Sequence, residues 1–305
     1  MMQEPAFHSG FVTLIGRPNV GKSTLLNAIL KQKVAAVSPR PQTTRKRQLG
    51  ILTTDDAQIV FIDTPGIHNP HHKLGEYMNN SATDTLLDAD LILWVVDVSE
   101  TPHEEDFLIS NRMLAIRSDL PVVMVLNKVD ILNLEQLEER KEKFQSLYPT
   151  ARLAEVSALS GTGQQSLLEL IVSALPLGPK YYPEDTVTDL YEREIAADLI
   201  REAALVNLRD EIPHALAVRI DEYLERGETG AKISATLFVE RDSQKGIVIG
   251  KAGSMLKEIG STARKEIERM SGRKVFLDLR VKTSQNWRND PHALRLFGFE
   301  SQKED

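Results

Sequence analysis

Apolar residues in the first part of the chain fall in short continuous runs, and segments of helical character separate them. The runs are GFVTLIG, AQIVFIDTPG, LILWVVDVS, PVVMVLNKVD and ARLAEVSALS, all before residue 176. They are too apolar for strands with one face in solvent, so we expect both faces of each strand to be buried. Helix-like segments such as GKSTLLNAILK and EQLEERKEKFQSL lie between them. This alternation predicts an α/β domain with a mostly parallel sheet and helices on both faces.

A different pattern follows after a break. Residues 175–189, LPLGPKYYPEDTVTD, contain three prolines and one glycine without an apolar period, which is typical of an interdomain linker. Beyond it we expect, in order, the helix LYEREIAADLIREAALVNL, the strands HALAVRIDEYLE and AKISATLFVER, the helix SMLKEIGSTARKEIERMSG and the strand KVFLDLRVKT. The pattern therefore predicts a first domain over residues 1–176, a linker over 177–189 and an α+β domain over 190–300.

Length and composition narrow the class of protein. With 305 residues the chain is long enough for two cores, and 41% hydrophobic and 27% charged residues are ordinary values for a soluble protein. Without cysteine there are no disulfides, thiolate metal sites or cysteine nucleophiles. We see no signal peptide and no apolar run of about 18 residues, and so expect a cytoplasmic protein.

The net charge of −7 is unevenly distributed. From residue 227 onward there are 15 Lys and Arg against 11 Asp and Glu, whereas the rest of the chain has 22 against 33. An acidic first part and a mildly basic last part indicate that the two domains have different partners.

The segment GRPNVGKS, Gly16 to Ser23, fits the phosphate-binding pattern G-x-x-x-x-G-K-[ST] between a predicted strand and a predicted helix. Small residues let the backbone wrap around a phosphate chain, with N–H groups pointing inward at the start of the helix. Lys22 would reach the β- and γ-phosphates, and the Ser23 hydroxyl would bind Mg²⁺. A chance glycine turn is the alternative, which the strand and helix on either side disfavour. The nucleotide contacts expected here are Gly16, Arg17, Pro18, Asn19, Val20, Gly21, Lys22, Ser23 and Thr24.

Asp63 ends the apolar strand in FIDTPG. A carboxylate in that place is costly unless it faces a cation directly or through water. An isolated aspartate at a strand end is more often a cap, but after a P-loop it becomes the expected second anchor for Mg²⁺, through water. Gly66 offers its amide to a γ-phosphate oxygen, and Thr64 and Pro65 of the same motif are expected nucleotide contacts.

The motif LNKVD ends another buried strand. The Asp130 carboxylate accepts hydrogens from the N1 and exocyclic N2 of guanine, and adenine has no such donors there. Asn127 would tie its loop to the purine, the Lys128 stem would cover the ring, and the backbone amides of Ser157 and Ala158 would receive guanine O6. The motif alone is weak, but in this chain order it predicts recognition of guanine.

These motifs, at these spacings, resemble the translation-factor-related GTPases. The resemblance makes SPRPQTTRKR, residues 38–47, the first switch, with Thr44 as a Mg²⁺ ligand, mobile until a γ-phosphate and Mg²⁺ order it. Small signalling GTPases place a water-orienting glutamine where this chain has Ile67. Intrinsic hydrolysis should therefore be slow, or the water must be held in another way.

Asn19 provides one such way. In related GTPases an asparagine at this place helps to bind K⁺, which supplies positive charge to the transition state. The alternative is that Asn19 only stabilises the loop. With these expectations, the residues assigned to catalysis are Lys22, Thr44, Gly66 and Asn19.

The turn Gly250-Lys251-Ala252-Gly253 has the G-x-x-G form of a KH domain, which clamps the backbone of about four single-stranded nucleotides. An isolated G-x-x-G is more often a helix cap. Here the segment LFVERDSQKGIVIGKAGSMLKEIGSTARKEIERM runs strand, helix, glycine turn, helix. The resulting order helix–strand–strand–helix–helix–strand matches the prokaryotic-type (type II) KH domain, in which bases lie in an apolar groove. The expected RNA contacts are Ile247, Ile249, Gly250, Lys251, Ala252, Gly253 and Lys257.

A P-loop GTPase joined to such a KH domain resembles the Era family of bacterial GTPases. The resemblance covers nearly the whole chain and rests on GRPNVGKSTLLN, PQTTR, DTPGIH, NKVD, VSAL, VIGKAG and the closing VKTSQNWRND with ALRLFGF. It implies GTP or GDP and Mg²⁺ as cofactors, binding to 16S rRNA near its 3′ end, and a role in assembly of the 30S ribosomal subunit. It further implies peripheral contact with the inner face of the cell membrane in some members. Nothing in the sequence indicates more than a monomer.

Other interpretations of the sequence stay open. A P-loop ATPase or kinase is disfavoured by Asp130. A non-ribosomal GTPase for tRNA modification or transport would use its C-terminal domain to bind protein, and a membrane-remodelling GTPase would need a basic lipid-binding helix that does not stand out. His68, His71 and His72 are expected in an exposed loop rather than in a metal site. Trp287 either stacks on a base or packs against the KH core.

Overall fold

The computed structural model describes residues 7–38, 43–67, 70, 72–209, 211–227 and 229–299. The chain forms two compact units. The first is built mainly from residues up to Asp189 and the second from Leu190 onward, with the short segments Ala36–Thr43 and Pro70–Tyr77 grouped with the second. The domain bounds given above stay predictions. Within the described ranges, no helix has the length and apolar character needed to cross a bilayer.

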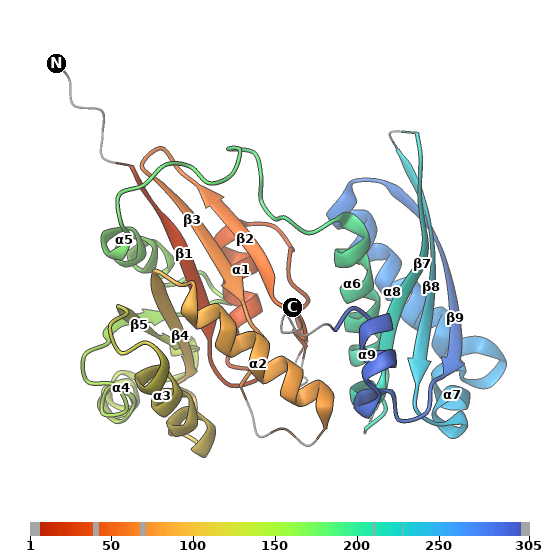
Figure 1. Ribbon diagram of the computed structural model, residues 1–305, viewed down its shortest axis with the longest axis horizontal. Coiled ribbons are helices and arrows are strands. Elements are labelled where there is room, and N and C mark those ends of the chain that lie inside the picture. The colour runs from red at the N-terminus through yellow and green to blue at the C-terminus, as the bar shows by residue number, and fades with distance from the viewer. Residues whose placement is uncertain are drawn as a thin grey trace. The chain divides into compact units, whose positions relative to one another are not determined.

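The first unit contains the expected sheet. Its strands are β1 (His8–Ile15), β2 (Gln48–Thr53), β3 (Ala57–Asp63), β4 (Leu91–Asp97), β5 (Val122–Asn127) and β6 (Arg152–Val156). They lie in the order β2-β3-β1-β4-β5-β6, and only the β2–β3 pair among them is antiparallel (Figure 1). The α/β class with a mostly parallel sheet is confirmed. The carboxyl ends of the parallel strands meet at one edge, where ligands bind in such sheets.

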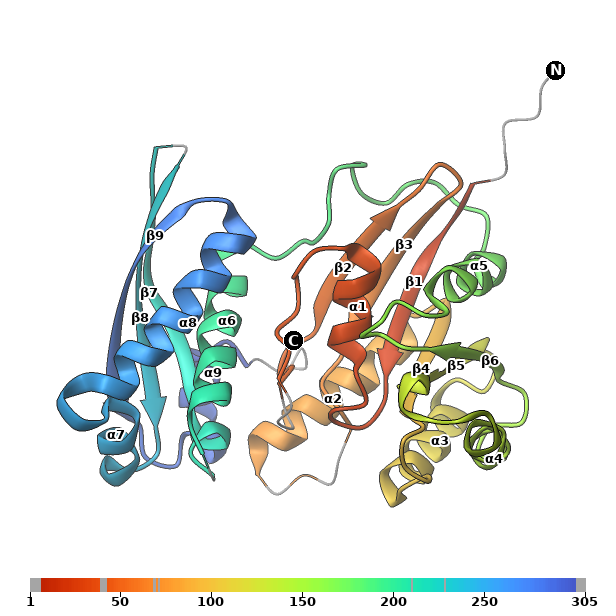
Figure 2. The ribbon, with the colours of Figure 1, turned by 180° about the vertical axis from the view of Figure 1, so that it is seen from behind.

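Helices cover both faces of this sheet, as the apolar strands predict. The helices are α1 (Lys22–Leu30), α2 (Lys73–Leu87), α3 (Glu104–Ile116), α4 (Leu134–Gln145) and α5 (Gln164–Ala174). Successive residues of β4 belong to cores on opposite faces of the sheet: Leu93 joins the core under α1 and α5, and Trp94 joins the core under α2, α3 and α4. Helix α1 lies in front of the sheet in Figure 2, and α2 lies behind it. The side chains of Leu93 and Trp94 are completely buried, which is why the strand reads as a continuous apolar run.

The edge strand β2 was not among the expected strands. Its sequence QLGILT follows the polar residues RKR and contains no long continuous apolar run. The side of β2 that does not pair with β3 accepts a segment from far along the chain, since the Ile51 N–H donates to the Val187 carbonyl at 2.8 Å. β2 is thus defined by pairing with β3 and not by its own pattern.

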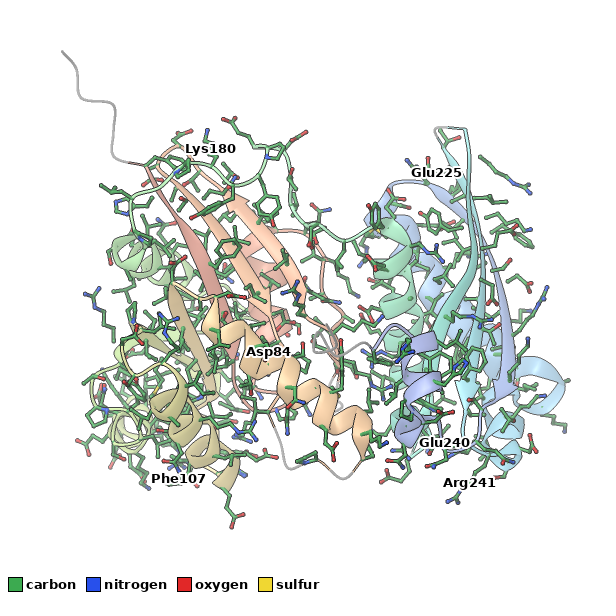
Figure 3. The ribbon with its side chains drawn as sticks, in the orientation of Figure 1. Asp84, Phe107, Lys180, Glu225, Glu240 and Arg241 are labelled. Atoms are coloured by element: carbon green, nitrogen blue, oxygen red, sulfur yellow. The ribbon has the colours of Figure 1, made fainter. Side chains whose placement is uncertain are left out.

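The segment before Val187 lies against the first unit and is held there by a buried amide. Gln58 of β3 is completely buried. Its Oε1 accepts hydrogen bonds from the Tyr181 and Tyr182 N–H groups at 2.6 and 2.9 Å, and its Nε2 donates to the Tyr182 carbonyl at 2.9 Å. Lys180, labelled in Figure 3, marks this stretch. Much of the proline-rich segment is therefore held against the first unit by hydrogen bonds.

The second unit has the helix–strand–strand–helix–helix–strand order expected of a KH domain. Its main elements are α6 (Glu192–Asn207), β7 (Ala217–Arg226), β8 (Gly230–Val239), α7 (Asp242–Ile249), α8 (Ser254–Ser271) and β9 (Lys274–Thr283), followed by α9 (Pro291–Leu296). β8 lies in the middle of the sheet, antiparallel to β7 and parallel to β9. The apolar faces of α6 and α8 pack on this sheet, with Ile200, Ile233 and Ile267 in the shared core.

Trp287 belongs to the core of the second unit. Its side chain is completely buried, and the indole Nε1–H donates to the Ala215 carbonyl at 2.8 Å. The rings of Phe297 and Phe299 lie 5.3 and 6.2 Å from it, the first edge-on and the second stacked. Of the two roles open from the sequence, packing is the one that the structure supports.

Replacement of Trp287 by alanine should lower the free energy of unfolding of the second unit by about 3–5 kcal/mol, because it leaves a large cavity and an orphaned carbonyl. Trp287→Phe should cost less. Urea denaturation followed by circular dichroism measures the loss, and fluorescence of Trp94, the remaining tryptophan, reports the first unit separately. A Trp287→Ala protein as stable as the parent would contradict this packing.

Candidate functional site

The P-loop joins β1 to α1 and contains the residue that caps the start of α1. Gly21, with φ of 101°, is the N-cap of α1 and makes no side-chain cap, so the first N–H groups of the helix stay available for an anion. Lys22 Nζ donates to the carbonyls of Gly16 and Arg17 at 2.8 and 2.9 Å. Burial of Lys22 lowers its pKa to about 8, and the neighbouring carboxylate of Asp63 opposes this shift.

The three residues predicted to hold Mg²⁺ lie together. The carboxylate Oδ2 of Asp63, completely buried at the end of β3, accepts hydrogen bonds from Ser23 Oγ at 2.7 Å and from Thr44 Oγ1 at 3.1 Å. The two hydroxyl oxygens are 2.9 Å apart. One carboxylate and two hydroxyls are hard oxygen donors, and Mg²⁺ is typically held by such a small set together with substrate phosphates and water. The donor set therefore fits the ion.

The loop after Asp63 lies against the P-loop. A Cβ added to Gly66 would come within 2.7 Å of the Pro18 nitrogen, so only glycine fits at this approach. The buried Thr64 hydroxyl donates to the Leu14 carbonyl of β1 at 2.7 Å, so this side chain serves the sheet; Pro65 is buried as well. Ile67 is buried in the core between the sheet and α2, and its side chain does not position a water.

Asn19 is exposed on the P-loop and adopts a φ of 65°. Asparagine tolerates this left-handed conformation better than most residues, which is in line with the loop-stabilising role. Both roles considered for Asn19 therefore remain predictions. Val20 is buried, and Thr24 is half-buried in the first turn of α1.

Asn127 connects the motifs at the carboxyl end of the sheet. Its Nδ2 donates to the Val20 carbonyl of the P-loop at 2.8 Å, and its Oδ1 accepts from the Ala158 N–H at 2.9 Å. The Ser157 N–H donates to the Thr162 carbonyl at 3.0 Å. Both amides predicted to receive guanine O6 thus make hydrogen bonds within the protein. Asp130 lies exposed in the short helical turn Val129–Ile131, where its carboxylate is accessible to a base.

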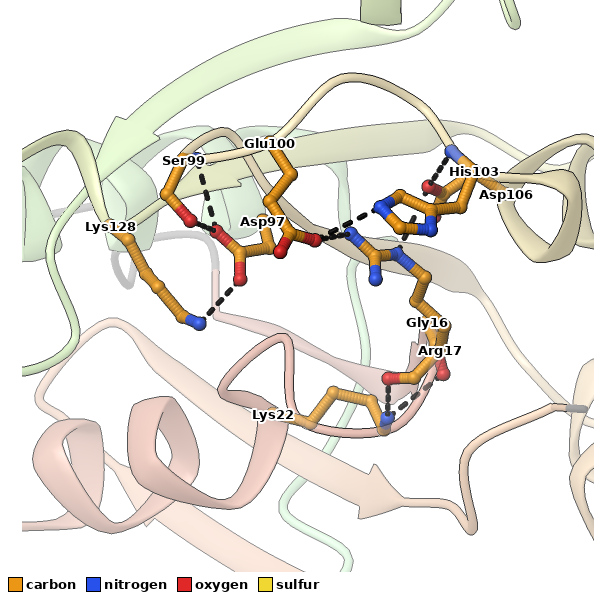
Figure 4. A network of polar contacts seen from close by, with 9 residues as sticks. All are labelled: Gly16, Arg17, Lys22, Asp97, Ser99, Glu100, His103, Asp106 and Lys128. Carbon is orange, nitrogen blue, oxygen red and sulfur yellow. Dashed lines mark hydrogen bonds and ion pairs between the residues drawn. The ribbon is translucent and has the colours of Figure 1, made fainter. Parts of the chain in front are cut away.

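Lys128 has a partner that the sequence did not indicate. Its Nζ donates to Asp97 Oδ2 at the end of β4 (Figure 4). The other oxygen of Asp97 accepts from the Ser99 N–H at 3.0 Å and from the Ser99 hydroxyl at 2.5 Å. Lys128 itself adopts a φ of 71°. The stem predicted to cover the purine is therefore held by a buried carboxylate on the neighbouring strand.

The Arg17 side chain points away from the P-loop toward the start of α3. Its Nε donates to Asp106 Oδ2 at 3.1 Å and its Nη2 lies 3.4 Å from Glu100 Oε2 (Figure 4). The sequence predicted Arg17 as a nucleotide contact, and in this structure only its backbone faces Lys22. The acidic start of α3 is visible in the sequence, but its pairing with Arg17, 89 residues away, is not.

The glycine turn of the second unit connects α7 to α8. Gly250 combines φ of 74° with ψ of 175°, and an added Cβ would lie 2.7 Å from the Met255 nitrogen, so this position requires glycine. Lys251 and Ala252 are exposed in the turn, and Lys257 is exposed on the first turns of α8. The first turn of α8 has no acidic residue, which leaves its N–H groups suited to a phosphate.

The apolar residues before the turn differ in exposure. Ile247 has 53% of its surface in solvent, Val248 is completely buried, and Ile249 is half-buried against the core. Ile247 is therefore the residue of this run with the most apolar surface for a base.

The histidine segment is described only in part. His68 and His71 lie outside the described residues. His72 Nδ1 accepts a hydrogen bond from the Gly75 N–H at 2.9 Å, at the start of α2. Within the ranges that the structure describes, no group of three or more His, Cys, Asp or Glu residues could hold a metal ion.

Comparison with known proteins supports both domains. Family models for a 50S ribosome-binding GTPase and for a KH domain match residues 11–128 and 211–288. GTPase Era of Heliobacterium modesticaldum is 47% identical over 296 residues, which cover 97% of this chain and 98% of that protein. The chain belongs to the Era family of GTPases.

Two solved Era structures share the fold over the same extent. Each has a TM-score of 0.90 and 38% identity and covers 97% of this chain and all of its own chain. One is Era in complex with MgGDPNP and nucleotides 1506–1542 of 16S ribosomal RNA, and the other is a variant of Aquifex aeolicus Era bound to GDP·AlF4⁻. The GTPase domain followed by a KH domain is thereby confirmed for this Era-family chain.

Replacing Asp130 by asparagine should weaken GDP binding about 100-fold or more, because an amide cannot accept both guanine hydrogens. Xanthosine diphosphate, which carries an oxygen at the 2-position, should then bind the variant more tightly than GDP. Competition with a fluorescent nucleotide measures both affinities. Asp55→Asn, a matched change in the exposed turn before β3, should leave them unchanged. An unaltered preference for GDP in Asp130→Asn would contradict the role of Asp130 in guanine recognition.

Proposed function

We propose that this Era-family protein is a GTP-hydrolysing switch that binds the 3′ region of 16S rRNA through its KH domain and acts in assembly of the 30S subunit. The observation that carries the switch is the shared carboxylate: one oxygen of Asp63 accepts hydrogen bonds from the P-loop Ser23 and from Thr44 of the first switch. A nucleotide that competes for these groups changes the order of the first switch and of the loop after Asp63.

Hydrolysis in this site rests on positioning and charge. Lys22 and the P-loop amides hold the β- and γ-phosphates, and the Gly66 amide receives a γ-phosphate oxygen. Mg²⁺, held by Ser23, Thr44 and, through water, Asp63, supplies charge neutralisation on the phosphate oxygens when bound. Because Ile67 is buried and apolar, another group must orient the attacking water, and Asn19 offers one route through a bound K⁺. The reaction needs no covalent intermediate.

RNA binding rests on the glycine turn of the KH domain. Exposed Lys251 and Lys257 supply charge, the start of α8 faces phosphate, and Ile247 supports a base. Ile249, Gly250, Ala252 and Gly253 complete the proposed contacts. A related Era binds nucleotides 1506–1542 of 16S rRNA, which supports a segment of 16S rRNA as the ligand. We place the protein in the cytoplasm, as a monomer; peripheral membrane contact stays a prediction.

An oligonucleotide with the 3′-end sequence of 16S rRNA should bind tightly with a non-hydrolysable GTP analogue, more weakly with GDP, and about tenfold or more weakly to Gly253→Asp, whose carboxylate opposes phosphate. Affinity should fall with salt at a log–log slope of about 0.7 per phosphate contacted. Fluorescence anisotropy at several KCl concentrations measures all of these.

The matched control for that variant is Gly272→Asp at the other end of α8. Gly253 and Gly272 have φ of 80° and 67°, and neither has an atom within 4 Å of an added Cβ. The two variants thus carry the same charge and similar backbone strain. Equal loss of RNA binding in both would point to damage of the domain, and binding that ignores the nucleotide would leave two uncoupled modules.

The proposed K⁺ role of Asn19 predicts GTP hydrolysis about tenfold faster in KCl than in NaCl, because a positioned cation neutralises charge in the transition state. Asn19→Gly accepts the positive φ but lacks the amide, and should abolish the difference. Phosphate release under single-turnover conditions measures the rates. If Asn19 only stabilises the loop, the parent would hydrolyse GTP equally fast in both salts.

A further inference from the structure

The Arg17 side chain connects the P-loop to the segment between β4 and α3 and to the start of α3 (Figure 4). Asp106, in the first turn of α3, has a completely buried side chain, and its Oδ2 receives Arg17 Nε at 3.1 Å. Only 10% of the Arg17 side chain is exposed. An ion pair with so little solvent is costly to break from one side, because the remaining charge is left buried without compensation.

Asp106 is fixed by its own helix. It is the third residue of α3, and its Oδ2 also accepts the His103 N–H at 2.9 Å, closing the cap of the helix. Further along α3, Ile109 and Met113 are completely buried in the core against the sheet. The carboxylate therefore has a rigid base and cannot follow Arg17 if the P-loop moves.

Arg17 connects the fixed carboxylate of Asp106 to the phosphate-binding Lys22. The Arg17 carbonyl accepts from Lys22 Nζ at 2.9 Å, next to the Gly16 carbonyl at 2.8 Å. One residue thus carries both the guanidinium that α3 holds and one of the two carbonyls that orient the ammonium group. The continuous series of contacts is Asp106 to Arg17 to Lys22.

We propose that Asp106 is a positioning residue for GTP hydrolysis, which acts through Arg17 to hold Lys22 in the orientation that the transition state needs. The proposal rests on the GTPase function proposed above. Guanine contacts and P-loop amides bind GTP and GDP alike, whereas the lysine charge matters most as charge develops during phosphoryl transfer. Misorientation of Lys22 should therefore appear in kcat more than in KM.

The primary test is Asp106→Asn, which keeps the size of the side chain and an oxygen for the helix cap but removes the carboxylate. We expect kcat to fall about 10- to 100-fold, as for a small misplacement of a catalytic group, with KM and the GDP affinity within about threefold of the parent. Glu104→Gln removes the same charge from an exposed site in the same turn and should leave kcat unchanged. Steady-state kinetics and GDP binding provide the comparison. An unchanged kcat in Asp106→Asn, or an equal loss of GDP binding and of kcat, overturns the proposal.

A double-mutant cycle with Arg17→Met separates positioning from general support of the fold. If Asp106 acts through Arg17, the double variant should hydrolyse GTP within about twofold of the slower single variant. If the fold-losses in kcat of the two single variants multiply in the double variant, the proposal is overturned. Should Asp106→Asn not fold, Arg17→Lys tests the same link, because its single ammonium group can keep the charge but not the guanidinium geometry; an undiminished kcat there overturns it too.

The GTPase activity of the parent protein distinguishes failure of the proposed function from failure of the positioning role. Absence of GTP hydrolysis in the parent would overturn the proposed function. The positioning role is then judged from the ratio of affinities for a GTP analogue and GDP, since Lys22 reaches the γ-phosphate. A ratio that Asp106→Asn reduces supports the positioning role, and an unchanged ratio overturns it.

Discussion

A buried carboxylate at the end of β3 is the constraint around which the nucleotide site is organised. Asp63 has no exposed surface, and an ionised group in that place is stable only with hydrogen-bond donors or a cation beside it. The donors come from Ser23 at the start of α1 and from Thr44, which is distant from both in sequence. The same oxygen atom thus connects the P-loop, the first switch and the sheet, and any cation that enters must compete with the two hydroxyl groups for it.

The parallel sheet explains why the other motifs converge. Each parallel strand ends at the same edge, so Gly16 after β1, Asp97 of β4, Asn127 of β5 and Ser157 after β6 are brought to one place although they are far apart in the chain. The side chains then join one another. Asn127 links the P-loop to Ala158, and Asp97 holds Lys128. A site assembled this way is largely formed before the ligand arrives.

The second unit follows different rules, because the RNA proposed as its ligand has a flexible backbone, whereas a nucleotide is compact. A glycine turn with an exposed lysine at the start of a long helix presents N–H groups and charge to any single strand. Sequence preference must come from apolar surface such as that of Ile247 and from base edges beyond the turn. Placing this module and a GTPase on one chain suits a protein that holds RNA during one nucleotide state and releases it in another.

The local pattern of the sequence determined most of the elements and nearly all of the chemistry. Continuous apolar runs identify strands buried on both faces, and the spacing of the P-loop, D-x-x-G, N-K-x-D and G-x-x-G motifs identifies the ligands, because each motif is a short segment whose backbone and side chains act together. The order of helices and strands in the type II KH domain can likewise be predicted from the sequence, since apolar residues recur with one period in helices and with another in strands.

Only the tertiary structure decided which strands and side chains contact one another. The edge strand β2 exists because β3 pairs with it, and the proline-rich segment is held against the first unit because Gln58 meets it from 123 residues away. Trp287 lies in the core of the second unit, and the Arg17 side chain pairs with Asp106, 89 residues away. These outcomes depend on which side chains the fold brings within hydrogen-bond distance. No local sequence pattern contains that information, because the partner of a buried charged group is the group nearest to it in space, which can be far away in the chain.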